Sequence, residues 1–267
     1  TAGLGAEESL VFRRSLDPAL LELNHRGYLN GHTPFSALLA FYTLLASHLS
    51  GCGQIALSNE SSANEATVPG TDINHQYSKS SHFEDRFRQY VSTTLGLDVD
   101  YFSLLRPLNE LQIAALFAKR PAYHGQVLSC NAGGKADQWC GQCPKCLFTA
   151  LILSPFLDDQ ALNRIFGQDL TMRADLIPLL DELAGWSQIK PFECVGTVHE
   201  VRAAVAEAAV QRKEHLPCLF GYAAGKLSEA DRQAFRAHLD HLNPEHHVPS
   251  DLATMVARAL QRAINEK

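Results

Sequence analysis

The chain of 267 residues lacks a long apolar run and lacks a surplus of basic residues. No apolar stretch approaches the roughly 20 residues that a membrane-spanning helix needs, and the N-terminus shows no basic region followed by an apolar one. We therefore expect a cytoplasmic protein without a membrane partner. The 23 Lys and Arg stand against 29 Asp and Glu, for a formal charge of −6. Proteins that bind the phosphate backbone of nucleic acid normally carry a basic surplus, so nucleic acid is not an expected partner.

Short apolar runs alternate with segments of helical spacing in the first part of the chain. The expected elements are a strand at 9–12, a helix at 33–48, a strand at 54–58, a helix at 80–95, a strand at 100–104 and a helix at 108–119. This order predicts an α/β fold in which helices flank a parallel sheet. We expect it over residues 1–155.

The strand pattern fades after residue 155, and residues 156–267 are expected to form an all-helical region. The expected helices lie at 158–166, 174–183, 197–213, 228–242 and 252–264. The chain begins with Thr1 rather than Met, which favours a fragment or a chain that has been cut.

Four of the seven cysteines, Cys130, Cys140, Cys143 and Cys146, lie close together in the sequence. Four thiolates fill the tetrahedral shell of one zinc ion, and two-residue spacers let neighbouring sulfurs face the same ion. We therefore predict a structural zinc knuckle over 130–146, with a helix that begins at Pro144. A filled shell leaves no position for water, which disfavours a catalytic zinc. An iron–sulfur cluster is the alternative metal centre.

A long polar loop leaves the strand at 54–58 and continues to Ser81. Ligands of parallel α/β sheets bind at the carboxyl ends of the strands, where this loop and the turn at Arg106 should meet. A histidine can exchange a proton near neutral pH, and a lysine offers a positive charge to an anion. We therefore expect His75 to transfer protons, with Tyr77 or Lys79 as the second acid.

The remaining polar residues of this loop, together with Arg106, are expected to bind substrate or nucleotide. They are Glu60, Ser61, Ser62, Asn64, Glu65, Asn74, Gln76 and Ser78. Glu60 or Glu65 could hold Mg²⁺ through oxygen. Two alternatives stay open, namely a loop that is only solvated surface and an Arg106 that forms a surface ion pair with a residue such as Glu110.

Several stretches of the sequence resemble known ATP enzymes. The segments 56–60, 105–111, 129–131 and 140–146 resemble the pyrophosphatase-loop enzymes, which have an adenine nucleotide alpha hydrolase-like fold. The likeness is to the latter half of 7-cyano-7-deazaguanine synthase, in which a similar cysteine set binds zinc. This resemblance implies ATP and Mg²⁺ in catalysis and Zn²⁺ as a structural ion.

A narrower resemblance is to the UDP-N-acetylmuramoyl-L-alanyl-L-glutamate epimerase family of peptidoglycan synthesis. It is carried by Ser58-Asn59-Glu60-Ser61-Ser62-Ala63-Asn64-Glu65, Asn74-His75-Gln76-Tyr77-Ser78-Lys79-Ser80 and Leu104-Leu105-Arg106-Pro107-Leu108-Asn109-Glu110. It implies a UDP-muramoyl dipeptide substrate whose terminal L-Glu is adenylated by ATP and then inverted to D-Glu.

One feature of the ATP enzymes is missing, namely a Ser-Gly-Gly-Lys-Asp-Ser-like loop after the first strand. Gly133-Gly134-Lys135 lies in the cysteine segment with no strand before it. We therefore expect an absent N-terminal ATP-binding segment, a second chain that supplies it, or a loss of ATP chemistry. Two other functions stay open: another carboxylate-adenylating enzyme such as a 7-cyano-7-deazaguanine synthase-like ligase, and a non-catalytic zinc-stabilised module.

Overall fold

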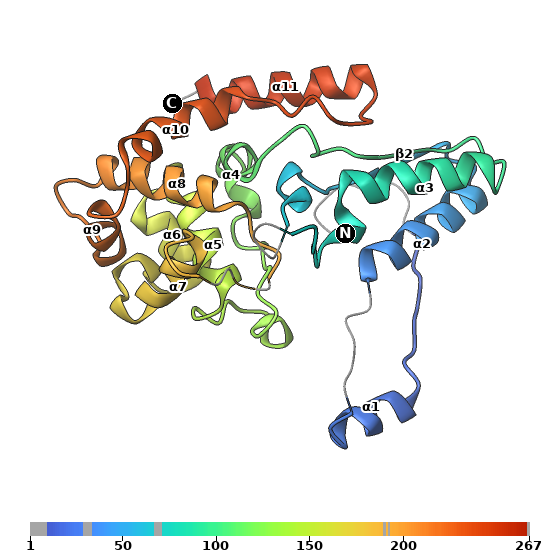
Figure 1. Ribbon diagram of the computed structural model, residues 1–267, viewed down its shortest axis with the longest axis horizontal. Coiled ribbons are helices and arrows are strands. Elements are labelled where there is room, and N and C mark those ends of the chain that lie inside the picture. The colour runs from blue at the N-terminus through green and yellow to red at the C-terminus, as the bar shows by residue number, and fades with distance from the viewer. Residues whose placement is uncertain (1–9, 29–33, 67–70, 189–190, 192, 266–267) are drawn as a thin grey trace.

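The computed structural model describes residues 10–28, 34–66, 71–188, 191 and 193–265. A small N-terminal α/β part lies beside a larger helical part (Figure 1). The α/β part and the elements that follow it are α1 (Pro18–His25), α2 (Phe35–Ser50), β1 (Gln54–Leu57), η1 (Ser61–Asn64), η2 (Tyr77–Lys79), α3 (Ser81–Thr93), β2 (Asp100–Ser103), α4 (Glu110–Ala118) and η3 (Pro121–Tyr123). The later elements are η4 (Gly134–Ala136), α5 (Pro144–Leu153), α6 (Asp159–Phe166), η5 (Leu170–Met172), η6 (Ala174–Leu176), α7 (Ile177–Leu183), α8 (Val198–Gln211), α9 (Cys218–Ala224), α10 (Glu229–Asp240) and α11 (Ser250–Asn265).

The described sheet consists of β1 and β2, which pair in parallel with Gln54 opposite Asp100. Helices α2 and α3 pack on it, and Ile55, Phe87 and Tyr101 lie in the small core that results. The predicted α/β character and the parallel pairing are therefore confirmed, on a sheet that has two strands in the described part of the chain.

The strand expected at 9–12 is wrong for residues 10–12, which form no regular structure, while Ser9 lies outside the described residues. A strand requires a neighbour that accepts its backbone hydrogen bonds. Phe12 instead stacks its ring on Tyr42 of α2, with the ring centroids 5.4 Å apart, and Val11 is 76% exposed. The expected start signal of the next helix at Thr33 also lies outside the described residues.

The helices begin at the polar residues that the sequence offers as caps. The Ser80 hydroxyl accepts a hydrogen bond from Phe83 N at the start of α3, and Asn109 forms a capping box with Gln112 at the start of α4. The short helices α1 and α9 were not expected from the sequence. Within the described residues, no helix combines the length and the apolarity that crossing a membrane requires.

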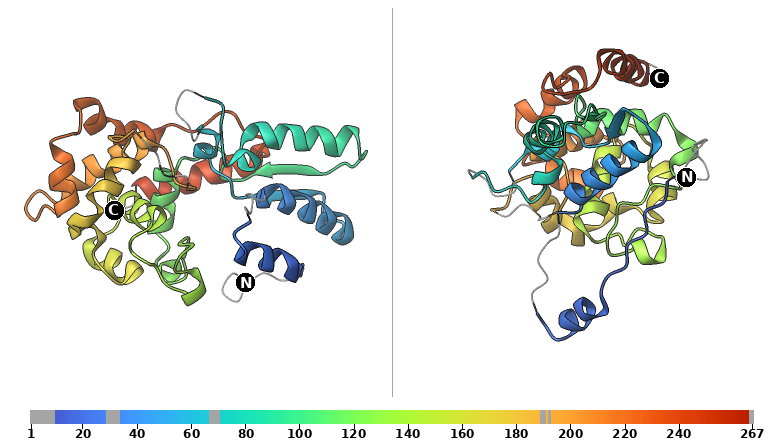
Figure 2. Two further views of the ribbon diagram at one scale, coloured as in Figure 1. Left: turned by 60° about the horizontal axis from the view of Figure 1, so that its bottom comes forward. Right: turned by 90° about the vertical axis from the view of Figure 1, so that its right-hand side faces the viewer.

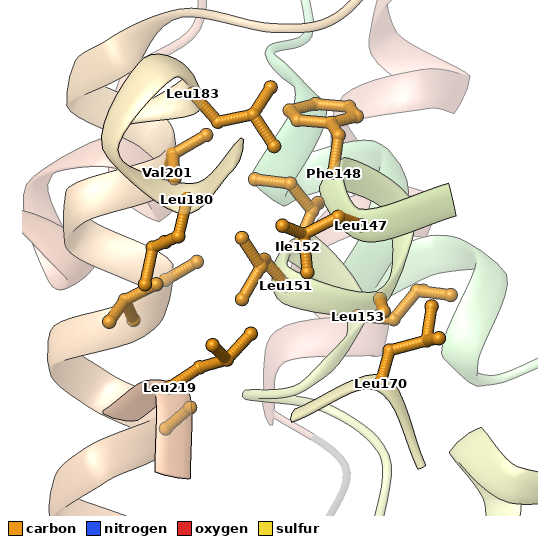
Figure 3. Packing of buried hydrophobic residues seen from close by; sticks show 14 of the residues in the cluster. Leu147, Phe148, Leu151, Ile152, Leu153, Leu170, Leu180, Leu183, Val201 and Leu219 are labelled. Atoms are coloured by element: carbon orange, nitrogen blue, oxygen red, sulfur yellow. The ribbon is translucent and has the colours of Figure 1, made fainter. Parts of the chain in front are cut away.

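The main core lies in the helical part and forms around α5, which is buried on almost every side (Figure 3). Leu147 and Leu151 of α5 are fully buried and lie near Leu180 of α7 and Val201 of α8. This core also includes Leu111 of α4, so α4 packs on the helical part while its N-terminus stays near the strands.

The chain returns to the strand ends through the segment 241–249, which links α10 to α11. Its Asn243 N donates to the carbonyl of Pro107 at 2.8 Å. Helix α11 then runs along the outside of α4, where Val256 and Leu260 bury Leu108 (Figures 1 and 2). Elements from the C-terminal part of the described chain therefore meet the turn that follows β2.

Candidate active site

The polar loop after β1 is held against the end of β2 by the side chain of Arg106. Arg106 is 1% exposed, and its guanidinium donates hydrogen bonds to the backbone carbonyls of Glu60 and Lys79. Near the start of the same loop, Ser61 N donates to the carbonyl of Leu108 at 3.1 Å. The structure thus brings both ends of the loop to the arginine.

A buried carboxylate compensates the charge of Arg106. Glu84 of α3 is 3% exposed, and its Oε2 lies 3.4 Å from Arg106 Nη2 and 2.6 Å from Ser103 Oγ. Two charges buried together need hydrogen bonds to replace those lost from water. The loop carbonyls and Ser103 supply most of them, while Arg106 Nε has no hydrogen-bond partner among the described residues. The expected alternative of a surface ion pair with Glu110 is wrong, because Arg106 is buried and pairs with Glu84.

Asparagine side chains fold the loop onto itself. Asn74 Nδ2 donates to the carbonyl of Ala63 at 2.8 Å, and Asn74 Oδ1 accepts from the backbone N of Gln76, which is buried. Asn64 Oδ1 accepts from Ser81 N at 2.8 Å. Part of the polarity of this loop is therefore turn chemistry. Binding of a ligand by these residues stays a prediction.

The residues expected to transfer protons differ in their surroundings. His75 and Lys79 are half-buried, as is Ser78, and Lys79 Nζ lies 3.5 Å from Gln76 Oε1. Tyr77 is 44% exposed, and its hydroxyl lies 2.9 Å from His82 Nδ1. Their roles in catalysis stay predictions.

A group of carboxylates lies where α4 and α8 begin. Burial and the charges of Glu60 and Glu200 raise the pKa of Glu110 well above its usual range, against the charge of Lys79 and a hydrogen bond with Ser62. The backbone N of Glu110 donates to Glu200 Oε1 at 2.6 Å. A carboxyl group with a raised pKa can keep its proton near neutral pH and act as an acid.

A cavity of about 340 Å³ opens between the polar loop and the C-terminal part of the chain. This volume is within the range of about 300–1,000 Å³ that is usual for small-molecule sites. The loop supplies one wall with Ser61, Ser62, Asn64 and Glu65, the starts of α4 and α8 supply Asn109, Thr197 and Glu200, and the second wall consists of His238, His241, Asn243 and Glu245. We call this space the inter-wall cavity.

Side chains of α4 fix the position of the second wall. Asn109 Nδ2 donates to the carbonyl of His238 at 2.8 Å. Gln112 is fully buried, and its Nε2 donates to the carbonyls of Leu239 at 3.0 Å and His241 at 2.9 Å. Burial lowers the pKa of His238, and the charges of His199 and His241 act in the same direction against that of Glu200. These effects favour the neutral form of the His238 ring.

The four cysteines Cys130, Cys140, Cys143 and Cys146 form a group of the shape that zinc requires. Their Sγ atoms all lie within 4.8 Å of one another, with pairs at 3.4, 3.7 and 3.8 Å. A tetrahedral shell with Zn–S bonds of roughly 2.3 Å places its sulfurs about 3.8 Å apart. The residues thus fit the predicted structural zinc. No other such group of three or more His, Cys, Asp or Glu ligands was found among the described residues.

The backbone around the cysteines supports the same assignment. Gly133 N and Cys140 N donate to Cys130 Sγ, and these bonds outweigh burial to lower the pKa of the Cys130 thiol to about 6. A Cβ at Gly133 would lie 1.9 Å from the carbonyl oxygen of Gln138, which explains this glycine without a phosphate ligand. Helix α5 begins at Pro144, as predicted, directly after Cys143.

Comparison with known proteins gives the family of the chain. Residues 3–104 match the MurL N-terminal domain, and residues 126–233 match the MurL C-terminal domain. The chain belongs to the MurL family. No solved structure matches it.

Three curated relatives of this MurL chain are each named UDP-N-acetyl-alpha-D-muramoyl-L-alanyl-L-glutamate epimerase. The protein of Salinispora tropica is 43% identical over 72% of the chain and 43% of its own length. The protein of Xanthomonas oryzae pv. oryzae is 42% identical over 73% of the chain and 45% of its own length. The protein of a Micromonospora species is 41% identical over 76% of the chain and 46% of its own length. The chain spans less than half the length of these relatives.

Sequence reasoning on the MurL chain missed the residues that the helical part contributes to the cavity. From the sequence alone, Glu200 is recognisable only as the capping partner of Thr197. His238 and His241 are recognisable only as polar residues near the end of a helix. His238 lies in the last turn of α10 and His241 is the C-cap residue of that helix, with extended backbone, so no helical spacing in the sequence marks them as neighbours in the cavity wall. Glu110 was noted only as a partner for Arg106.

Metal analysis tests the cysteine cluster. We expect the purified protein to hold one zinc per chain and Cys143→Ser to lose it together with thermal stability, because three thiolates leave the shell open. Elemental analysis and thermal melting measure both. Cys194→Ser, at an exposed cysteine outside the cluster, is the matched control. Iron with visible absorption would instead support the iron–sulfur alternative.

A stability measurement tests the role of Arg106. Arg106→Met should lower the free energy of unfolding by about 3–5 kcal/mol, because Glu84 would stay buried without its partner. Urea denaturation followed by circular dichroism measures this. Adding Glu84→Gln to the variant removes the stranded charge and should recover part of the loss. A variant as stable as the wild type would contradict a structural ion pair.

The raised pKa of Glu110 predicts a pH-dependent effect on stability. The unfolded carboxyl titrates near about 4.3, so above that pH the folded protein holds an extra proton and loses stability as the pH rises toward the folded pKa. Glu110→Gln cannot ionise, so its free energy of unfolding relative to wild type should increase between pH 5 and pH 8. A difference that stays constant over this range would show that the carboxyl is ionised throughout.

Proposed function

We propose that this chain takes part in the epimerisation of the terminal L-Glu of UDP-N-acetylmuramoyl-L-Ala-L-Glu to D-Glu, in the synthesis of peptidoglycan precursors. Membership of the MurL family and the shared name of the three relatives support the substrate and the reaction. The observation that carries the proposal for this chain is the inter-wall cavity, which has polar side chains on two walls beside the ends of the parallel strands.

The chemistry explains why such an enzyme would use ATP. The α-proton of a glutamate with a free carboxylate is hard to remove, because the resulting carbanion lies next to a negative charge. Esterification of that carboxylate by AMP cancels the charge and makes the carbonyl an electron acceptor. We propose this acyl-adenylate route for the reaction, followed by hydrolysis that releases AMP.

The residues of this chain suit the handling of the dipeptide and its α-proton. We assign proton transfer to His75, with Tyr77 or Lys79 as a second acid. The hydroxyls of Ser61 and Ser62 line the cavity and can donate hydrogen bonds to substrate carboxylates. The other expected ligand-binding residues of the loop belong to the same proposal.

The fit to ATP is incomplete within the described residues. No strand there leads into a glycine-rich phosphate loop, and Gly133 serves the cysteine cluster. We therefore derive no step in which this chain holds the phosphates, and the adenine nucleotide alpha hydrolase-like fold stays a proposal supported by the parallel strands and their flanking helices. Mg²⁺ usually binds one or two carboxylates together with substrate phosphates, a role that Glu60 and Glu65 suit.

An isotope experiment tests the proposed function. We expect the protein, given UDP-N-acetylmuramoyl-L-Ala-L-Glu, ATP and Mg²⁺ in deuterated water, to form D-Glu with deuterium at the α-carbon, together with AMP and pyrophosphate. His75→Ala should lower the rate of epimerisation at least about 100-fold, because general acid–base groups contribute about 10²–10⁴-fold. Chiral chromatography and mass spectrometry measure both products.

The controls separate the alternatives. His215→Ala removes an exposed histidine that does not line the inter-wall cavity, and it should leave the rate within about threefold of wild type. A wild-type rate in His75→Ala would remove His75 from the mechanism. AMP release without inversion would favour another carboxylate-adenylating enzyme, and neither product would contradict the proposed function.

A further inference from the structure

An inversion at carbon needs a proton acceptor on one face of the substrate and a proton donor on the other. The groups assigned above, His75, Tyr77 and Lys79, all belong to the polar loop, of which Ser61, Ser62, Asn64 and Glu65 line the inter-wall cavity. The second wall comes from the helical part, beyond residue 233, where the match to the MurL C-terminal domain ends. The proposed function therefore leaves open which group serves the other face.

The titratable side chains around the cavity differ in the hydrogen bonds that they already form and in their exposure. Glu200 accepts hydrogen bonds from Thr197 N, Thr197 Oγ1 and Glu110 N, and it is 2% exposed. Its carboxylate therefore links the starts of α8 and α4 through these hydrogen bonds. Glu245 is exposed, and its negative charge would repel the carboxylates of the dipeptide.

His238 has the properties that a proton-transfer group requires. Its backbone carbonyl is fixed by Asn109, its side chain is half-buried in the cavity wall, and no hydrogen bond to its ring is found among the described residues. The charged or titratable groups that act on it are Glu200 and His199 of α8 and His241 at the end of its own helix. The lowered pKa of its ring keeps the acceptor form present at neutral pH.

We propose that His238 is the second proton-transfer residue of the epimerase, which acts from the wall opposite the polar loop. In one direction, a ring nitrogen of His238 accepts the α-proton while the electron pair of the C–H bond moves into the activated carbonyl. A group of the loop wall then donates a proton to the other face of the same carbon. In the reverse direction the two walls exchange roles, so no oxidant or reductant is consumed. This inference rests on the proposed function.

Isotope exchange from each isomer separates a proton-transfer role from a structural one. His238→Gln should lower epimerisation at least about 100-fold. It should still exchange the α-proton of one isomer, L-Glu or D-Glu, with deuterated water, because the loop wall remains intact. His75→Ala should give the opposite pattern. Nuclear magnetic resonance of the glutamyl α-proton, with ATP and Mg²⁺ present, follows both isomers.

His247→Gln is the matched control, because His247 lies in the segment that follows α10 but binds Asp85 and does not line the inter-wall cavity. It should exchange and invert both isomers at wild-type rates. If His238→Gln is folded by circular dichroism and loses exchange of both isomers equally, or inverts at the wild-type rate, the assignment of His238 is overturned. If the wild-type protein exchanges neither isomer, the proposed function itself fails, and the assignment fails with it.

Discussion

The structure depends on one buried guanidinium. Arg106 lies three residues after β2, where the chain turns from the sheet toward the helical part, and its two terminal nitrogens bind carbonyls at both ends of the polar loop. Glu84 balances its charge from α3. The loop is therefore held at the strand ends by an interaction that water does not reach.

The same turn positions the second wall. Arg106 and Pro107 present their carbonyls to Asn243, and Asn109 and Gln112 hold the end of α10. Helix α4 packs its other side on α5, whose first turn carries Cys146 and whose N-cap residue is Cys143. A structural ion at those cysteines would thus stabilise the helix core on which α4 rests, and through α4 the cavity.

Local sequence signals predicted the elements well. The caps Ser80 and Asn109, the cysteine spacing and Pro144 each act within a few residues, and the structure has helices α3, α4 and α5 where they indicate. The strand expected at 9–12 failed for its described residues, because an apolar run does not reveal whether a partner strand exists.

The sequence predicted one part of the candidate site and missed the other. The strand-end argument brought the polar loop and Arg106 together, but it did not predict the ion pair with Glu84. Ligand binding by Arg106 stays a prediction. The residues of the second wall lie more than a hundred positions from the polar loop in the sequence. Long-range hydrogen bonds such as that from Asn109 to His238 cannot be recognised in a single sequence. The shift in the pKa of Glu110 likewise arises from burial and from the charges of Glu60 and Glu200, and only the fold produces both.

The claim that Arg106 holds the loop is tested most directly by hydrogen exchange. Amide exchange measured by mass spectrometry should show that Arg106→Met loses protection in peptides that cover 58–66 and 74–84, while peptides from α5 keep theirs, since α5 lies in a separate core. Unchanged protection of the loop peptides in a folded variant would contradict the account.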